Sequence, residues 1–351
     1  MASPWCYLQP EHREAGTEVL NTQTGQDPPL TMKILRIARP AVSIIFILVL
    51  FFVVEKGDLS TRFRHVNLLF LMISLGLIPL MILLNSLRWK VLLDHQGYRI
   101  SVGYLMKMYF IGYLFSNLLP SDVGGDLIRS YYAGRKIGDQ TAAAASVLLD
   151  RFSGLLILLI LTILAPFIVP GLYGNPAVYL PAAFSFCLMV VVIYLLRRKV
   201  PLTPAERIVN KESAWGRLYG YLREFRQKLN IVVDAFKEDR RILWKVFSFS
   251  VVIYLLRWVN VYFAFLTFSV QPDFVKLAAV IPTIMLVSLI PISQGSIGLA
   301  EGAHVFYFSL IGIDVASSLA MALFMRFKLL VAGGVGAVYY LAMKENPGRD
   351  N

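Results

Sequence analysis

The sequence predicts an all-α polytopic membrane protein with about six spanning helices and two re-entrant helical hairpins, arranged as an inverted repeat. The 351 residues are 57% hydrophobic and only 16% charged, with a mean hydropathy of +0.63. Several apolar runs reach the ~20 residues that a spanning helix requires. Two runs are interrupted by a Pro-x-x-x-Gly sequence, and paired breaks in corresponding parts of two halves are typical of secondary transporters.

Each predicted spanning helix is an apolar run bounded by basic residues or by helix-breaking residues. Lys33 and Arg36 precede the first run, Arg88-Trp89-Lys90 follows the second, and Pro170-Gly171 stops the third. Arg197-Arg198-Lys199 ends the fourth. The six predicted spans are residues 37–54, 67–87, 143–169, 177–196, 243–268 and 314–342.

The composition divides the chain into three parts. Residues 1–31 are polar, without periodicity, and predict a disordered N-terminal tail. Residues 32–343 predict one membrane domain, with repeat halves at about 37–169 and 177–342. Residues 344–351 form a C-terminal tail.

The distribution of basic residues predicts the orientation. Residues 197–245 carry 13 lysines and arginines, which places this loop in the cytoplasm, whereas the uncharged loop 170–176 lies outside. Counting from these loops predicts a multi-pass plasma (cell inner) membrane protein with both termini cytoplasmic. The apolar segments 101–120 and 276–311 must then each begin and end on one side, so we expect them to be re-entrant, from opposite faces. Ordinary proline-kinked helices are the alternative.

The two breaks share small and polar residues. Each lies a similar distance beyond an Arg-Trp pair, with 32 residues from Arg88 to Pro120 and 34 from Arg257 to Pro291. Non-helical backbone at membrane depth is tolerated only against protein or a watery cavity, so the breaks predict a central cavity. The residues expected to form the breaks are Asn117, Pro120, Gly124 and Gly125 in the first, and Pro291, Ser293, Gly295 and Gly298 in the second.

Charged residues near the first break are candidates for binding a lipid headgroup. A helix that starts near Asp126 would present free N–H groups to an anion, and Arg129 offers a fork that matches phosphate. A helix cap and an orientation signal are the alternative readings of these two residues. Asp150 and Arg151 lie in an otherwise apolar run, and either an internal salt bridge or a place in the cavity is expected.

The second half carries its own charged residues within apolar runs. Arg257, Arg326 and Lys328 lie far from the helix ends, so each needs a carboxylate, carbonyl groups or a ligand. Glu301 is a candidate partner, which makes a structural ion pair the alternative to headgroup binding. His304, one turn beyond, is read as a packing residue.

The sequence gives no indication of a metal or cofactor. Four histidines and two cysteines are scattered without metal-ligand spacing. The net charge of +12 is explained by orientation signals and anionic lipid, so no nucleic-acid partner is expected. Residues 213–236 have the periodicity of an amphipathic helix, either on the membrane surface or against a partner.

In their order and spacing, these motifs resemble the lysylphosphatidylglycerol synthase transmembrane-region family, also called the flippase-like family. The resemblance covers residues 32–343, and the family more often has Glu in place of Asp126 and Gly in place of Ser296. The motifs that carry it are Leu87-Arg88-Trp89, Asn117–Gly125 followed by Asp126 and Arg129, Asp150-Arg151, and Pro291-x-Ser293-x-Gly295 leading to Gly298-x-x-Glu301.

The resemblance implies the translocation of a membrane lipid. The expected partner is a phospholipid or a polyprenyl-phosphate-linked lipid, held by Arg129, Arg257 and Arg326. No synthase activity is expected, because the soluble aminoacyl-transfer domain of two-part members does not follow before Asn351. A membrane glycosyltransferase, or a scaffold that binds a lipid-modifying enzyme through the loop 197–241, are the alternatives.

Overall fold

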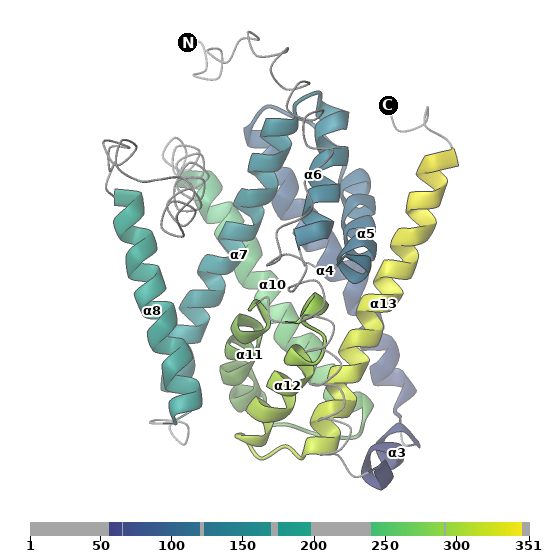
Figure 1. The fold of residues 1–351 in the computed structure, drawn as a ribbon, viewed down its shortest axis with the longest axis vertical. Helices are drawn as coiled ribbons and strands as arrows, with labels where there is room; N and C mark the ends of the chain where they lie inside the picture. The colour runs from purple at the N-terminus through teal and green to yellow at the C-terminus, as the bar shows by residue number, and fades with distance from the viewer. Residues whose placement is uncertain are drawn as a thin grey trace, which may run out of the picture.

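The computed structural model describes residues 56–64, 66–119, 123–169, 175–197, 240–290 and 293–345, and every regular element within them is helical. Figure 1 shows the helices running mostly along the long axis of the molecule. The predicted first span at 37–54, the tail 1–31, the amphipathic segment 213–236, Pro120 and Pro291 lie outside the described residues.

Five of the described helices are long and apolar enough to cross a membrane. They coincide with the second to sixth predicted spans, because a bilayer demands long apolar runs that the sequence shows directly. Their bounds are α4 (Leu68–His95), α7 (Gln140–Ile168), α8 (Pro176–Arg197), α10 (Arg240–Thr267) and α13 (Val315–Glu345).

The start of three helices is fixed by a side chain that accepts hydrogen bonds from free backbone N–H groups. Asn67 caps α4 and Asp139 caps α7, while Asp273 caps α11 (Phe274–Ser288). Such caps each stabilise a helix end by ~0.5–2 kcal/mol. At its other end α4 continues two turns beyond the predicted limit at residue 87, so that Arg88 lies inside the helix.

Two pairs of shorter helices form the hairpins. The first pair is α5 (Val102–Leu118) and α6 (Val123–Ile137); the second is α11 and α12 (Leu299–Ser309), joined through the short 3₁₀ turn η4 (Gln294–Ser296). In Figure 1 the first pair lies in the upper half of the bundle and the second in the lower half. Helix α6 packs against α5 and forms the return arm of the first hairpin.

The order of long, short, short and long helices occurs twice, in α4–α7 and again in α10–α13. The long helices α4 and α10 pack against each other, and α13 packs along α5 of the other half. The two halves are therefore interlocked. A short helix α3 (Lys56–Arg64) lies at the lower end, where the Phe63 ring contacts the Phe268 ring edge-on at 5.4 Å.

Glycines let α13 approach α5 closely. A side chain at Gly336 would overlap the Phe110 carbonyl group, and one at Gly333 would meet the Asn117 amide, which donates to the Leu329 carbonyl at 3.0 Å. Gly334 faces open space. Close helix packing is therefore the role of Gly333 and Gly336.

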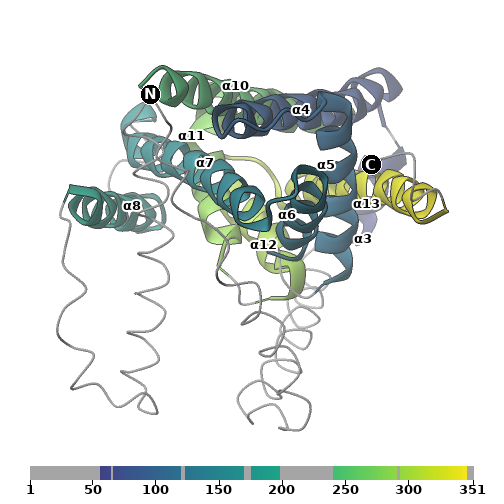
Figure 2. The same ribbon diagram turned by 90° about the horizontal axis from the view of Figure 1, so that it is seen from above.

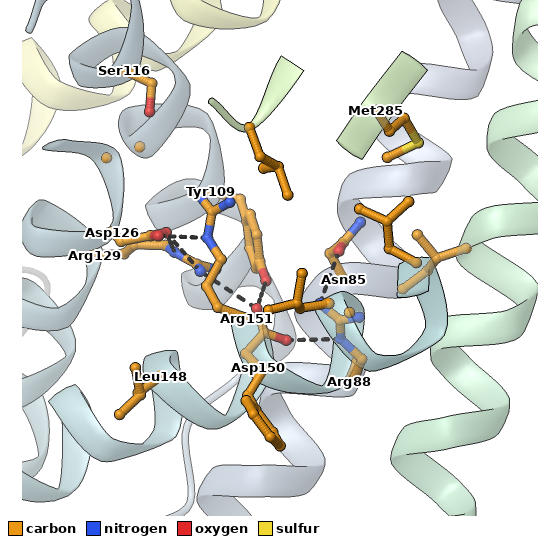
Figure 3. Close-up of a pocket in the computed structure, with 18 of the residues that line it drawn as sticks. Asn85, Arg88, Tyr109, Ser116, Asp126, Arg129, Leu148, Asp150, Arg151 and Met285 are labelled. Carbon is orange, nitrogen blue, oxygen red and sulfur yellow. Dashed lines mark hydrogen bonds and ion pairs between the residues drawn. The ribbon is translucent and has the colours of Figure 1, made fainter. Parts of the chain in front are cut away.

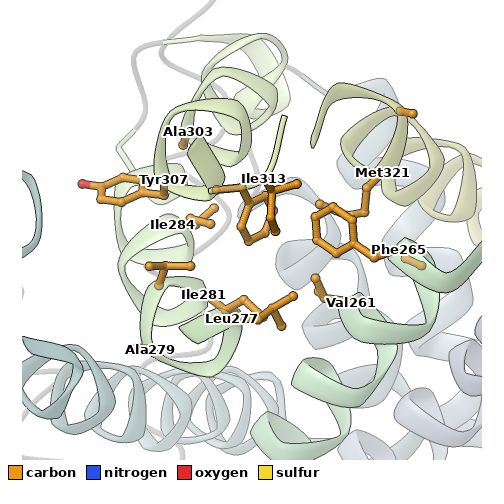
Figure 4. Close-up of a cluster of buried hydrophobic side chains, with 14 of the residues drawn as sticks. Val261, Phe265, Leu277, Ala279, Ile281, Ile284, Ala303, Tyr307, Ile313 and Met321 are labelled. Carbon is orange, nitrogen blue, oxygen red and sulfur yellow. The ribbon is translucent and has the colours of Figure 1, made fainter. Parts of the chain in front are cut away.

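A buried apolar cluster holds the second hairpin in place between α10 and α13 (Figure 4). Phe265 of α10 and Phe308 of α12 are both fully buried, and their rings meet edge-on at 5.0 Å. By contrast, α8 lies at the edge of the bundle beside α7 (Figure 2) and exposes large apolar side chains such as Phe184 and Phe186. That exposure suits a surface that faces lipid.

Candidate functional site

A cavity of about 460 Å³ opens between the first hairpin and the helices α4, α7, α10 and α11. Figure 3 shows its charged side chains converging from different helices. Its wall is mostly apolar. Its polar and charged lining residues include Asn85, Arg88, Tyr109, Ser116, Asp126, Arg129, Asp150, Arg151 and Arg257.

Asp150 of α7 is the centre of a buried hydrogen-bond network. Its Oδ1 accepts from Arg88 Nε at 2.8 Å, and its Oδ2 accepts from Tyr109 Oη at 2.8 Å and from Arg129 Nη2 at 3.4 Å. The Asp150 side chain is only 2% exposed. Two guanidinium groups thus compensate one buried carboxylate, which is the arrangement that a charge needs at low dielectric.

Asp126 connects this network to the mouth of the cavity. It lies in the first turn of α6 and accepts from Arg129 Nε at 3.0 Å and from Arg151 Nε. Arg129 is 4% exposed and Arg151 is 53% exposed. Asp126 therefore binds one buried arginine, Arg129, and one exposed arginine, Arg151.

Aromatic rings hold the Arg129 guanidinium from the sides. The Tyr109 ring centroid lies 4.2 Å from its central carbon and that of Trp89 lies 5.0 Å away, which are cation–π distances. Trp89 is itself fixed, since its Nε1 donates to Ser146 Oγ at 2.8 Å. Arg129 Nη1 is buried without a hydrogen-bond partner. Among the described residues this nitrogen of the clamped guanidinium has no acceptor.

Arg257 enters the cavity from α10 without a carboxylate partner among the described residues. Its contacts are Met285 Sδ, 3.8 Å from Nη1, and the Tyr254 ring, 5.5 Å from its central carbon. Its Nε is buried without a hydrogen-bond partner. A sulfur atom and a ring compensate a guanidinium far less than an anion does.

The two halves contain the same ion pair at the same spacing. Arg151 of α7 donates to Asp126 of α6, and Arg326 of α13 donates to Glu301 of α12 at 2.8 Å. Both pairs are 25 residues apart in sequence. In each half the acid stands in the second helix of the hairpin and the arginine in the long helix that follows.

This correspondence explains why Arg257 is unpaired. Asp150 directly precedes Arg151, and in the second half Met325 directly precedes Arg326. The Arg-Trp pair of α4 therefore has a carboxylate opposite Arg88, whereas the matching position for Arg257 is a methionine. The two halves therefore differ in one acidic residue: Asp150 of the first half corresponds to Met325 of the second.

Arg326 and Glu301 do not line the cavity; they support the second break. Arg326 Nη1 donates to the Gly295 carbonyl at 3.1 Å and Nη2 to the Ser296 carbonyl at 3.3 Å, while Glu301 Oε2 accepts from the Gly298 N–H at 2.6 Å. Gly295 and Gly298 both have positive φ, at 57° and 82°. The side chains satisfy backbone groups that the interrupted helix leaves free.

The candidate residues from the sequence thus form two groups. Arg129, Arg257, Asp126, Asp150 and Arg151 meet in one cavity, whereas Arg326 and Glu301 lie at the second break. Ser293 is buried beside that break, and Gly125 lines the cavity at the start of α6. His304 lies within α12, with its Nδ1 2.6 Å from the Ala300 carbonyl oxygen.

Four further residues at or beside the cavity were not predicted as site residues: Arg88, Tyr109, Trp89 and Asn85. Arg88 was read as the end of a span, because a basic residue after an apolar run is the usual orientation signal. Its partner Asp150 is 62 residues away, and only the fold brings the two together. The Arg-Trp repeat was the one signal in the sequence that pointed to it.

The charged lining residues of the cavity carry an excess of positive charge. Four arginines line it against two aspartates, an excess of two among the described residues. Three arginines have carboxylate partners, and Arg257 does not. In a largely apolar wall this arrangement favours an anion with several acceptor oxygens. Among the described residues no cluster of His, Cys, Asp and Glu is suited to a metal ion.

Comparison with known proteins gives one family. Its model, the lysylphosphatidylglycerol synthase TM region, matches residues 36–335. Two UPF0104 membrane proteins of Methanothermobacter thermautotrophicus are 21% and 24% identical over 85% and 86% of this chain, and the matches cover 93% and 91% of those proteins. A UPF0104 membrane protein of Methanocaldococcus jannaschii is 23% identical over 81% of this chain and 88% of its own length. No solved structure matches. The chain is an integral membrane protein that belongs to the lysylphosphatidylglycerol synthase TM-region family.

Proposed function

We propose that the protein moves a membrane lipid with an anionic, phosphate-bearing headgroup between the two leaflets. The observation that carries this proposal is Arg257, a part-buried arginine that lines a positively charged cavity, has no carboxylate partner among the described residues and has a buried Nε without an acceptor. The family description supports a role connected with lipid, since it names a phospholipid synthase.

The headgroup would complete the hydrogen bonds that the protein leaves open. Arg129 Nη1 and Arg257 Nε both lack an acceptor, and an unsatisfied buried donor costs ~1–3 kcal/mol. A phosphate group offers several acceptor oxygens, and guanidinium forks match it in geometry. The phosphate bridges α6 and α10, which belong to different halves, so binding would link the halves.

The two hairpins supply the path in this proposal. Each is proposed to enter the membrane from its own face and to turn back within it, with both arms of the first hairpin lining the cavity and the second hairpin contributing Met285 and Leu289. The acyl chains stay in the bilayer while the headgroup passes through. Asp126 and Asp150 exchange partners with the headgroup as their arginines engage it.

The test is lipid movement in vesicles. The purified protein is reconstituted into phosphatidylcholine vesicles that contain fluorescent phosphatidylglycerol, and the fraction of label that becomes accessible to a membrane-impermeant quencher is followed over time. Fluorescent phosphatidylcholine, whose headgroup has no net charge, is the comparison lipid. Wild type should speed the exposure of the anionic lipid and Arg257→Ala should abolish that effect.

The matched control is Arg62→Ala. Arg62 is a half-exposed arginine that pairs with Asp314 at 3.4 Å outside the cavity, and exposed pairs contribute only ~0–1 kcal/mol. Its flux should equal that of wild type. Equal flux in wild type, Arg257→Ala and Arg129→Ala would overturn the proposal and favour a scaffold for a lipid-modifying enzyme.

A further inference from the structure

Lys328 is a buried lysine that does not line the cavity. It lies in α13 and is 3% exposed. Its Nζ donates to Ser74 Oγ of α4 at 2.9 Å and to Asn260 Oδ1 of α10 at 2.8 Å. Lys328 thus joins one long helix of the first half to two long helices of the second.

No carboxylate pairs with Lys328 in the part of the chain that the structure describes. The groups that face it from α4 and α10 are Ser74 and Asn260, and neither titrates. The nearest charged residue on its own helix, Arg326, is bound to Glu301. The other buried basic residues with polar contacts, Arg88 and Arg129, both have carboxylates.

The remaining helices that pack on α13 direct their titratable groups elsewhere. From α12, His304 lies against the Ala300 carbonyl. From α3, Arg62 pairs with Asp314 at the start of α13. From α5, Phe110, Phe115 and the Asn117 amide contact α13, and Tyr113 lines the cavity. An ammonium at Lys328 is therefore a buried charge without a counter-charge, which costs several kcal/mol, and release of its proton removes that cost.

The hydrogen bonds of Lys328 suit both protonation states. A neutral amine has two N–H groups, and the structure gives it two acceptors, Ser74 Oγ and Asn260 Oδ1. The ammonium has a third N–H, and the Phe324 ring centroid lies 4.9 Å from Nζ, at a cation–π distance. Ser74 Oγ also donates to Asn260 Oδ1 at 3.0 Å. The three side chains are therefore hydrogen-bonded to one another whether Lys328 is neutral or protonated.

We propose that Lys328, Ser74 and Asn260 form a proton-binding site that couples the protonation state of Lys328 to the packing of α13 against α4 and α10. Protonation places a charge between three helices and release removes it. Because α13 also carries Arg326, which supports the second break, the site is connected to the hairpin. Proton binding does not depend on the proposed function; only the use of the proton to drive lipid movement rests on it.

The first test is the dependence of unfolding on pH, measured in nanodiscs for wild type and Lys328→Met. An unfolded lysine keeps its proton up to about pH 10. Where the folded site is neutral, the unfolded state binds one proton more, so the wild type gains stability as pH rises. The unfolding equilibrium constant should fall by up to about tenfold per pH unit relative to Lys328→Met.

Lys276→Met is the matched control, because Lys276 is an exposed lysine on α11. Its pH dependence should run parallel to that of wild type. Lys328→Gln serves in the same comparison if the methionine variant fails to insert. Parallel curves for wild type and the Lys328 variants would overturn the proposal, since Lys328 would then keep one protonation state throughout.

The second test is the flux of fluorescent phosphatidylglycerol in vesicles with an imposed pH gradient. The gradient should change the initial rate of wild type several-fold and leave Lys328→Met unchanged. An equal response of both would overturn the coupling. These outcomes can be distinguished from a failure of the proposed function. If the protein moves no lipid, flux is absent in wild type and in every variant, but the pH dependence of unfolding can still be measured and still tests proton binding.

Discussion

Arg88 and Arg257 each begin an Arg-Trp pair in a long helix of their own half, but only Arg88 binds a carboxylate. Arg88 Nε donates to Asp150 at 2.8 Å, whereas Arg257 meets Met285 Sδ at 3.8 Å. Two similar sequence positions thus have different roles. One is part of the buried network, whereas the other has no carboxylate partner among the described residues.

A carboxylate placed beside Arg257 should compete with the ligand. In Met285→Glu the new carboxylate lies within reach of Arg257, and a charge-assisted hydrogen bond is worth ~1.5–3 kcal/mol. We expect retention of anionic lipid on purification to fall by about tenfold or more, as measured by mass spectrometry. Met285→Gln, which has the same shape without the charge, should retain lipid at close to the wild-type level; equal loss in both would contradict the explanation.

Asp150→Asn should be strongly destabilising. The substitution leaves Arg88 and Arg129 buried around a neutral amide, and breaking a buried pair costs ~3–5 kcal/mol. Thermal unfolding in nanodiscs measures the change. Asp94→Asn is the control, because Asp94 forms an exposed pair with Lys90 and should change stability by less than ~1 kcal/mol. Similar effects of the two substitutions would show that the buried network contributes little.

Glu301→Gln should loosen the second break. The variant loses the charge that binds Arg326 and weakens the acceptor for the Gly298 N–H, at a cost of ~1–3 kcal/mol. Hydrogen exchange of the peptide that contains residues 293–302 should speed up, while exchange in α5 should stay unchanged. An unchanged rate at the break would mean that the apolar cluster around Phe308 holds it alone.

Two neighbouring glycines of α13 should respond in opposite ways to alanine. Gly336→Ala forces a methyl group against the Phe110 carbonyl of α5 and should destabilise the protein by ~1–3 kcal/mol. Gly334→Ala points into open space and should be neutral or stabilise the helix by up to ~1 kcal/mol. Thermal unfolding of the two variants gives the comparison, and equal shifts would argue against a tight α5–α13 contact.

The spanning helices were predictable because a chain that crosses the hydrocarbon core of a bilayer must satisfy its backbone hydrogen bonds internally over a long apolar run. Each of α4, α7, α8, α10 and α13 is an apolar run of the necessary length, and its backbone hydrogen bonds are satisfied within the helix. Helix ends were less predictable. The second span was expected to stop at Arg88, yet the helix continues to His95 because Asp150 and Ser250 give the Arg88 guanidinium its partners.

The partners within the site were not predictable from patterns. The sequence predicted Arg129, Arg257 and Arg326 as three arginines that would hold a lipid headgroup. The fold gives each a different environment, since Arg129 is clamped by rings and carboxylates, Arg326 supports the second break, and Arg257 has no counter-charge among the described residues. Such pairings join residues far apart in sequence, and hydropathy says nothing about them.

The net excess of two positive charges among the described cavity residues would interact with a transmembrane voltage. Moving one elementary charge through 100 mV corresponds to ~2.3 kcal/mol. An empty cavity that shifts relative to the field carries its excess charge with it, whereas a bound phosphate cancels part of that charge. If the protein carries an anionic lipid as proposed, a membrane voltage would therefore act differently on the loaded and the empty protein.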